Sequence, residues 1–219
     1  MRFLKATLVT IIGFMPLFAA ATEQVTVVKQ SDVVVEDTSA YHRMNKKFSV
    51  TGQPLGFAVG SIPSYGANVG YFINRNMVGQ LEFTEGKLNY LFFDIRATTV
   101  AANLKIFTGN SFYIKSGVAY RKVAVDNVLC LLCKDPASSF GYNEALAAEL
   151  AIGNQWQWDT FTLGCDWIGL MVPVANLRSN SGDTSRFTQS EKDDVDRMWN
   201  VIGRTTSSQL VRLYLGVTF

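Results

Sequence analysis

The feature that most constrains the fold is the strict two-residue alternation of the segment Ser207–Phe219, which reads SSQLVRLYLGVTF. One face of this segment is wholly apolar and consists of Val211, Leu213, Leu215, Val217 and Phe219. The other face mixes charge, hydroxyl groups and glycine and consists of Leu210, Arg212, Tyr214, Gly216 and Thr218. Side chains of a β-strand point alternately to its two faces, so the pattern predicts a strand with one apolar side.

Seven earlier segments repeat this alternation of apolar with small or polar residues. They are Pro54–Gly60, Gly66–Ile73, Met77–Thr84, Thr98–Phe107, Ser111–Lys122, Glu144–Asn154 and Thr160–Pro173. The last of them becomes apolar on both faces after Trp167, and its pattern gives no clear phase for Ile168–Val172. With the segment Ser207–Phe219, the expected number of strands is eight.

The connections between the expected strands differ in length at the two ends of the sheet. Short turns are expected at Asn74–Asn76, Thr108–Asn110 and Asn154–Asp159. Longer loops are expected at Glu85–Ala97, Val123–Asn143 and Val174–Thr206, and the short connection Ser61–Tyr65 falls on their side. Short turns at one end and longer loops at the other are typical of membrane barrels. The sequence therefore predicts an all-β fold, a closed antiparallel up-and-down transmembrane β-barrel of about eight strands.

Residues 1–21 have the layout of a secretory signal peptide. They contain a basic start, an apolar run and a small-residue cleavage site, namely Arg2 and Lys5, Ala6–Met15, and Ala19–Ala21. The alternative is a membrane-anchor helix, but the apolar run is shorter than the about 20 residues that span a bilayer. We expect an exported chain that starts at Thr22, with residues 22–47 as a periplasmic tail and residues 48–219 as an outer-membrane barrel.

No later segment is apolar over a length that could form a spanning helix. Only helices and closed barrels satisfy all their backbone groups in lipid, so the exported chain is soluble, surface-bound or a β-barrel. A secreted, lipocalin-like barrel is one alternative. Its apolar face would point inward, and its other face would carry more charge than the Gly and Ala found here.

The composition argues against several classes of function. Charged residues make up 17% of the chain, whereas about 25% is usual in soluble domains. The formal net charge is +2, and removal of Arg2 and Lys5 with the signal peptide brings it to zero, so we expect no nucleic-acid partner. The single histidine, His42, lies outside every expected strand. A serine–histidine pair therefore cannot be placed in the barrel, and we expect no enzyme activity, metal or cofactor.

The C-terminal segment resembles the C-terminal signature of bacterial outer-membrane β-barrels, because its apolar face ends on Phe219. The resemblance is close over the last 11–13 residues and extends by pattern to the small eight-stranded type, such as the OmpA transmembrane domain, OmpX and OmpW. It implies that the last strand closes the barrel and that Phe219 is an assembly signal read by the barrel-assembly machinery. It also implies outer-membrane lipid as the surroundings of the wall.

Seven charged residues fall at positions expected to point inward. They are Glu82, Lys105, Lys115, Arg121, Glu149, Asp166 and Arg212. They could line a polar pathway or gate, or they could form a salt-bridge network that fills the lumen. About eight strands leave an interior just wide enough for side chains, which favours the network. We expect Asp166 and Arg212 to meet, because they lie on neighbouring strands at similar distances from the short turns.

Two features fall on the expected long loops, 123–143 and 174–206, where an external ligand or partner could bind. Cys130 and Cys133 form a single C-x-x-C motif, for which a local disulfide is favoured over zinc in an exported loop. Cys165 is then left to pack as a small apolar residue. Apolar residues at helical spacing after Ser190 predict a short helix on the barrel rim.

The leading hypothesis is an integral outer-membrane barrel with a structural or surface-interaction role and a lumen mostly filled by side chains. The alternative is a narrow channel for small hydrophobic compounds, as in the OmpW type. Aromatic residues in the loops and the doubly apolar segment Ile168–Val172 favour that alternative. A lipid-modifying outer-membrane enzyme is the third hypothesis, and the position of His42 argues against it.

Overall fold

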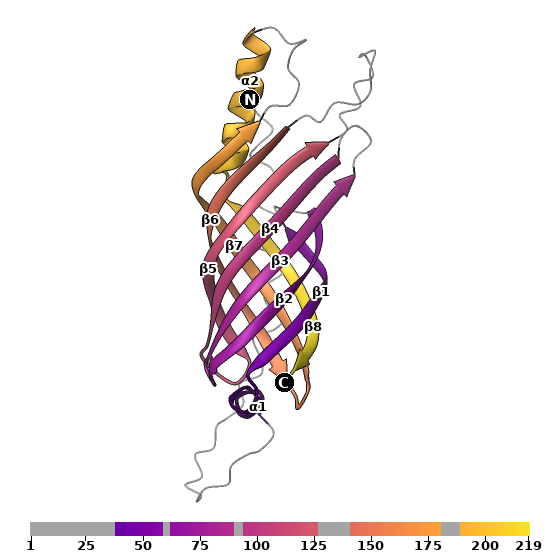
Figure 1. Cartoon of the computed structure of the whole chain (residues 1–219), viewed down its shortest axis with the longest axis vertical. Coiled ribbons are helices and arrows are strands. Elements are labelled where there is room, and N and C mark those ends of the chain that lie inside the picture. The colour runs from indigo at the N-terminus through magenta and orange to yellow at the C-terminus, as the bar shows by residue number, and fades with distance from the viewer. Residues whose placement is uncertain (1–37, 59–61, 90–93, 127–140, 181–188) are drawn as a thin grey trace, which may run out of the picture. The chain divides into compact units, whose positions relative to one another are not determined.

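The computed structural model describes residues 38–58, 62–89, 94–126, 141–180 and 189–219 of the chain. Over these residues eight β-strands form one closed antiparallel barrel, in which each strand pairs with the next and β8 pairs with β1 (Figure 1). The strands are β1 (Phe48–Ala58), β2 (Ile62–Asn74), β3 (Met77–Asn89), β4 (Asp94–Phe107), β5 (Phe112–Asp126), β6 (Gly141–Gln157), β7 (Phe161–Asn180) and β8 (Ser207–Thr218). The expected fold class is confirmed, and this architecture fits a small outer-membrane β-barrel.

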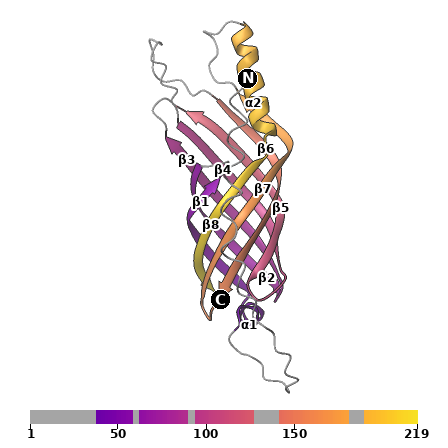
Figure 2. The same cartoon turned by 180° about the vertical axis from the view of Figure 1, so that it is seen from behind.

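Within the described ranges two helices accompany the barrel, one at each end (Figures 1 and 2). α1 (Ser39–Asn45) lies at the end with the short turns, within the segment expected to be a tail. α2 (Gln189–Arg204) lies at the other end, where helical spacing predicted a helix, and its Trp199 is fully buried. In the described part of the chain, neither helix is long and apolar enough to cross a membrane.

The barrel wall has the inverse polarity of a soluble protein. Leu81 and Val118 point outward and expose 65% and 63% of their surface, whereas the neighbouring inward side chain of Glu82 exposes 5%. The same alternation runs along the other strands, with apolar residues outside and polar residues inside. An outward apolar face is what lipid requires of a barrel. A lipocalin-like barrel needs the opposite arrangement, so that alternative is wrong.

The strands at the long-loop end extend further than the sequence predicted. β3 and β4 remain paired up to Asn89 and Asp94, so most of the segment expected as a loop at Glu85–Ala97 is a hairpin. Likewise, β5 ends at Asp126, β6 begins at Gly141 and β7 ends at Asn180. Beyond the apolar band the outward residues include Lys87 and Arg96. Backbone pairing continues there, although the alternation that marks a strand has faded.

Extra residues interrupt the alternation in three adjacent strands at the same height. In β7, Trp167 and Ile168 are both exposed, and the register with β6 shifts between Ile152 and Gly153. This β-bulge reverses the phase of β7, which is why Ile168–Val172 showed no clear pattern. Beyond it, Gly169 and Met171 are buried.

Comparable breaks correct the sequence reading of β8 and β1. In β8 the alternation of inward and outward residues reverses at Leu210 and Val211. At the beginning of the strand, Ser207 and Gln209 are therefore the inward residues, and Leu210 is only half-buried. Val211 has a φ of 39°, a left-handed conformation that is strained for a β-branched residue. In β1 both Pro54 and Leu55 are exposed. That break limits the visible alternation to the residues from Pro54 onward, although the strand itself begins at Phe48.

Replacing Leu213 by Arg is expected to block membrane insertion. Leu213 lies on the apolar outer face and is opposite Leu55 and Cys165 of the two neighbouring strands. A charge facing lipid near the midplane costs roughly 2–4 kcal/mol. The measurement is the amount of heat-modifiable, folded protein in the membrane fraction. Leu213→Ile is the matched control and should insert like the wild type; equal insertion of Leu213→Arg would contradict the face assignment.

Candidate functional site

All seven charged residues expected to point inward are buried, with at most 5% of each exposed. The structure divides them by their contacts. Five converge in one cluster, which we call the charge network: Glu82, Lys115, Glu149, Asp166 and Arg212. Lys105 and Arg121 make different contacts inside the barrel.

The charge network consists of two cations that each bridge the same three carboxylates. Lys115 Nζ lies 3.3 Å from Glu82, 2.9 Å from Glu149 and 2.8 Å from Asp166. The Arg212 guanidinium donates through Nη1 to Glu82 and through Nη2 to Glu149, at 3.1 Å, and to Asp166. These residues come from β3, β5, β6, β7 and β8, so the network links strands across the lumen.

The pair expected to meet, Asp166 and Arg212, lies directly opposite across the β7–β8 ladder. Asp166 also accepts a hydrogen bond from the hydroxyl of Tyr113. The network is therefore held by neighbouring-strand contacts and by contacts across the barrel. Charged hydrogen bonds of this kind are roughly twice as strong as neutral ones.

Two buried tyrosines, which the sequence analysis did not assign to the site, connect Lys105 to the network. Lys105 Nζ donates to the Tyr214 hydroxyl at 2.9 Å and lies 4.6 Å and 4.2 Å from the ring centroids of Tyr113 and Tyr214. The Tyr214 hydroxyl lies 3.2 Å from that of Tyr113, which in turn donates to Asp166. Both tyrosines occupy inward positions of their strands. That position was the available signal, because an inward tyrosine in a narrow lumen needs a polar partner.

Arg121 lies apart from the network, toward the long-loop end. Its Nη1 donates to Ser207 Oγ at 3.0 Å and to the Thr205 carbonyl at 3.3 Å. Arg121 therefore connects β5 to the turn between α2 and β8. Arg121 is buried inside the barrel, and its partners depend on the curvature of the closed wall.

The short-turn end of the barrel is closed by α1. Arg43 is fully buried, and its guanidinium lies 3.7 Å from the ring centroid of Phe107. Its Nε donates to the Arg75 carbonyl at 2.9 Å and its Nη2 to the Gly109 carbonyl at 3.4 Å, in two different turns. Burial lowers the pKa of Arg43 to about 10, so its charge is retained at neutral pH.

Further contacts attach α1 to the third short turn. The backbone N–H of Gln157 donates to Ser39 Oγ at 3.0 Å, and Lys46 forms an ion pair with Asp159 at 3.1 Å. The hydrogen bond and charge of Lys46 lower the pKa of the exposed Asp159 carboxyl below its ordinary value. His42 lies on this same helix. Contacts with all three turns make α1 a floor for the lumen.

The remaining predicted residues lie elsewhere. Cys130 and Cys133 lie outside the described residues, and Cys165 is a buried free thiol. Phe219 is exposed, its ring stacks on Phe48 at 6.1 Å, and its N–H donates to the Phe48 carbonyl. Over the described ranges, no group of His, Cys, Asp or Glu side chains is arranged to hold a metal ion.

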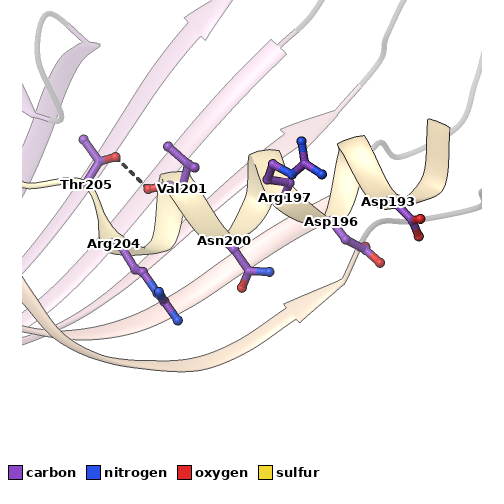
Figure 3. A pocket seen from close by; sticks show the side chains of 7 residues that line it. All are labelled: Asp193, Asp196, Arg197, Asn200, Val201, Arg204 and Thr205. Carbon is purple, nitrogen blue, oxygen red and sulfur yellow. Dashed lines mark hydrogen bonds between the residues drawn. The ribbon is translucent and has the colours of Figure 1, made fainter. Parts of the chain in front are cut away.

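α2 lies within the long-loop region 174–206 and presents a polar surface. One side of the helix and the residue after it line a depression of about 600 Å³, formed by Asp193, Asp196, Arg197, Asn200, Val201, Arg204 and Thr205 (Figure 3). The helix packs against β7 and β6, and a chain of amide contacts runs from Asn143 through Asn176 to Asn200.

Comparisons with known proteins show a distant structural similarity to a solved β-barrel domain. No protein-family model and no curated protein matches the sequence. The structure is similar to the crystal structure of the N-terminal β-barrel domain of Pseudomonas aeruginosa OprF, with a TM-score of 0.44 and 11% sequence identity. The match covers 80% of this chain and 98% of that domain. The strand pairing of this chain, rather than this similarity, defines its architecture.

Replacing Arg212 by Met is expected to destabilise the folded barrel by about 3–5 kcal/mol, because it leaves buried carboxylates uncompensated. Arg96→Met is the control, since Arg96 is 54% exposed and lies 3.9 Å from Glu85; loss of an exposed pair costs under about 1 kcal/mol. Urea unfolding in lipid vesicles, followed by tryptophan fluorescence, gives both values. Equal unfolding midpoints for the two variants would show that the network does not stabilise the fold.

Proposed function

We propose that the protein is an integral outer-membrane β-barrel with a structural or surface-interaction role and a closed lumen. The observation that carries this proposal is the charge network, whose five side chains come from five strands and are all buried within the barrel. Paired charges that cross the lumen at one level, together with α1 against its short-turn end, support a closed lumen. The apolar outer face supports insertion in lipid.

The long-loop end supports the surface-interaction part of the proposal. The described pairing of β7 with β8 stops at Met171. The pairing of β7 with β6 continues beyond this point, as far as Asn180 and Tyr142. This extension carries α2 and its polar depression. In a barrel of this class the longer loops face the outside of the cell. An external ligand or partner would thus meet the loop regions 123–143 and 174–206, while the assembly machinery and outer-membrane lipid are the partners of the wall.

One observation that favoured a channel for small hydrophobic compounds now has another explanation. The channel alternative rested partly on the apolar character of both faces over Ile168–Val172. The bulge at Trp167 accounts for that pattern, because Ile168, Leu170 and Val172 all become outward residues beyond it. They lie on the apolar outer face and do not line the lumen.

The closed lumen predicts an absence of stepwise ion conductance. Purified wild-type protein in planar lipid bilayers should give no discrete current steps, whereas a general porin inserted in the same way should give them. Arg43→Ala, which removes the floor contacts but keeps the charge network, should also be silent. Stable steps from the wild-type protein, or its transport of a small hydrophobic compound into vesicles, would favour the channel alternative.

The surface role predicts opposite accessibility of the two barrel ends. In a variant in which Cys130, Cys133 and Cys165 are replaced, a cysteine is introduced either at Asp193 of α2 or at Asn110 of a short turn, both exposed positions. A membrane-impermeant maleimide should label Asp193→Cys in intact cells and Asn110→Cys only after lysis. The reverse result would contradict the orientation, and no labelling of either in intact cells would contradict surface exposure.

A further inference from the structure

A basic notch lies at the short-turn end, between the end of α1 and the last residues of β2. It has a volume of about 730 Å³, and its lining includes Arg43, Lys46, Lys47, Tyr71, Ile73 and Arg75. This lining contains four basic side chains and no acidic one. The backbone holds the notch in place, because the Phe72 N–H donates to the Lys47 carbonyl at 2.9 Å and Arg43 holds the Arg75 carbonyl.

Two of the four cations in the notch are available to a ligand. Lys46 is paired with Asp159, and Arg43 is buried against Phe107. Lys47 and Arg75 are exposed, and neither forms an ion pair with any residue that the structure describes. In addition, the buried Nη1 of Arg43 has no hydrogen-bond partner within the described ranges. The notch thus has an uncompensated positive charge that suits an anion, and an arginine beside a lysine suits phosphate oxygens.

An apolar groove continues from the notch along the outer wall. It has a volume of about 580 Å³ and crosses β2, β3, β4 and β5. Tyr71 lines both the notch and the groove. The strand register explains the hollow. Tyr71, Gly79, Leu104 and Ser116 lie side by side on neighbouring strands. Gly79 and Ser116 are small, so they leave space between the larger side chains. In the neighbouring row of outward-facing residues, the small side chain of Ala102 lies between Leu81 and Val118.

We infer that the notch and the groove together form a binding site for one anionic phospholipid, with its phosphate between Lys47 and Arg75 and an acyl chain in the groove. The inference rests on the proposed membrane location. A lipid is favoured over a free phosphate ion because the notch opens beside the exposed apolar side chains of Tyr71 and Ile73. The end of the apolar wall is the depth at which lipid headgroups lie, and basic residues near that surface attract anionic lipids.

The test is lipid binding to the folded, heat-modifiable protein in detergent, measured by native mass spectrometry. Dioleoylphosphatidylglycerol should be retained, and dioleoylphosphatidylcholine should be retained more weakly. The double variant Lys47→Gln/Arg75→Gln should lose phosphatidylglycerol affinity by roughly tenfold or more. Lys87→Gln/Arg96→Gln removes the same charges at the opposite end and should bind like the wild type. Equal phosphatidylglycerol affinity of the two double variants would overturn the site.

A second experiment distinguishes a bound lipid from a bound free anion. Ala102→Trp fills the groove at an exposed position and should reduce retention of the dioleoyl lipid while the protein remains folded. Inorganic phosphate should not displace the lipid at equal concentration. Unchanged retention by Ala102→Trp, or displacement by phosphate, would overturn the lipid assignment. Failure of the wild type to enter membranes would instead contradict the proposed function, whereas insertion without phosphatidylglycerol preference would contradict only the lipid site.

Discussion

The constraint on which the structure depends is the placement of charge inside a wall whose outer face is apolar. Glu82, Glu149 and Asp166 would be unpaired charges if they faced outward into lipid, and inside the narrow lumen they must be paired. Lys115 and Arg212 each contact all three carboxylates. Because three carboxylates share two cations, the loss of either cation enlarges the excess of buried negative charge. The shared contacts also link the five strands that carry these residues.

Other buried residues extend the polar contacts along the inside of the barrel. Tyr113 and Tyr214 extend the network to Lys105, and α1 closes the short-turn end through Arg43. These contacts fix the interior side chains of several strands, and the proposed functional surfaces lie outside the lumen. The proposed partner surface at α2 and the proposed lipid site at the short turns lie at opposite ends of the wall.

The alternation of residues indicates the buried face of a strand best where it continues without interruption. Along β5, for example, Tyr113 and Lys115 are buried while Phe112 and Ile114 are exposed, as the alternation indicated. It is least informative where an extra residue reverses the phase. The bulge at Pro54 concealed the first half of β1, and beyond the apolar band the strands no longer carry an alternating signal although their backbones still pair. Arg43 was missed because it lies on a short helix outside the periodic region.

The sequence by itself indicated the fold class, the number of strands and an inward face for seven charged residues, because alternation is a local property of an extended chain with an apolar surface on one side. It did not determine which inward residues meet. Asp166 and Arg212 were matched from their heights on adjacent strands, but the contacts of Lys115 with Glu82, of Lys105 with Tyr214 and of Arg121 with Ser207 cross the lumen. Only the tertiary structure decided these, since closure of the sheet and its strand register bring together side chains that are far apart along the chain.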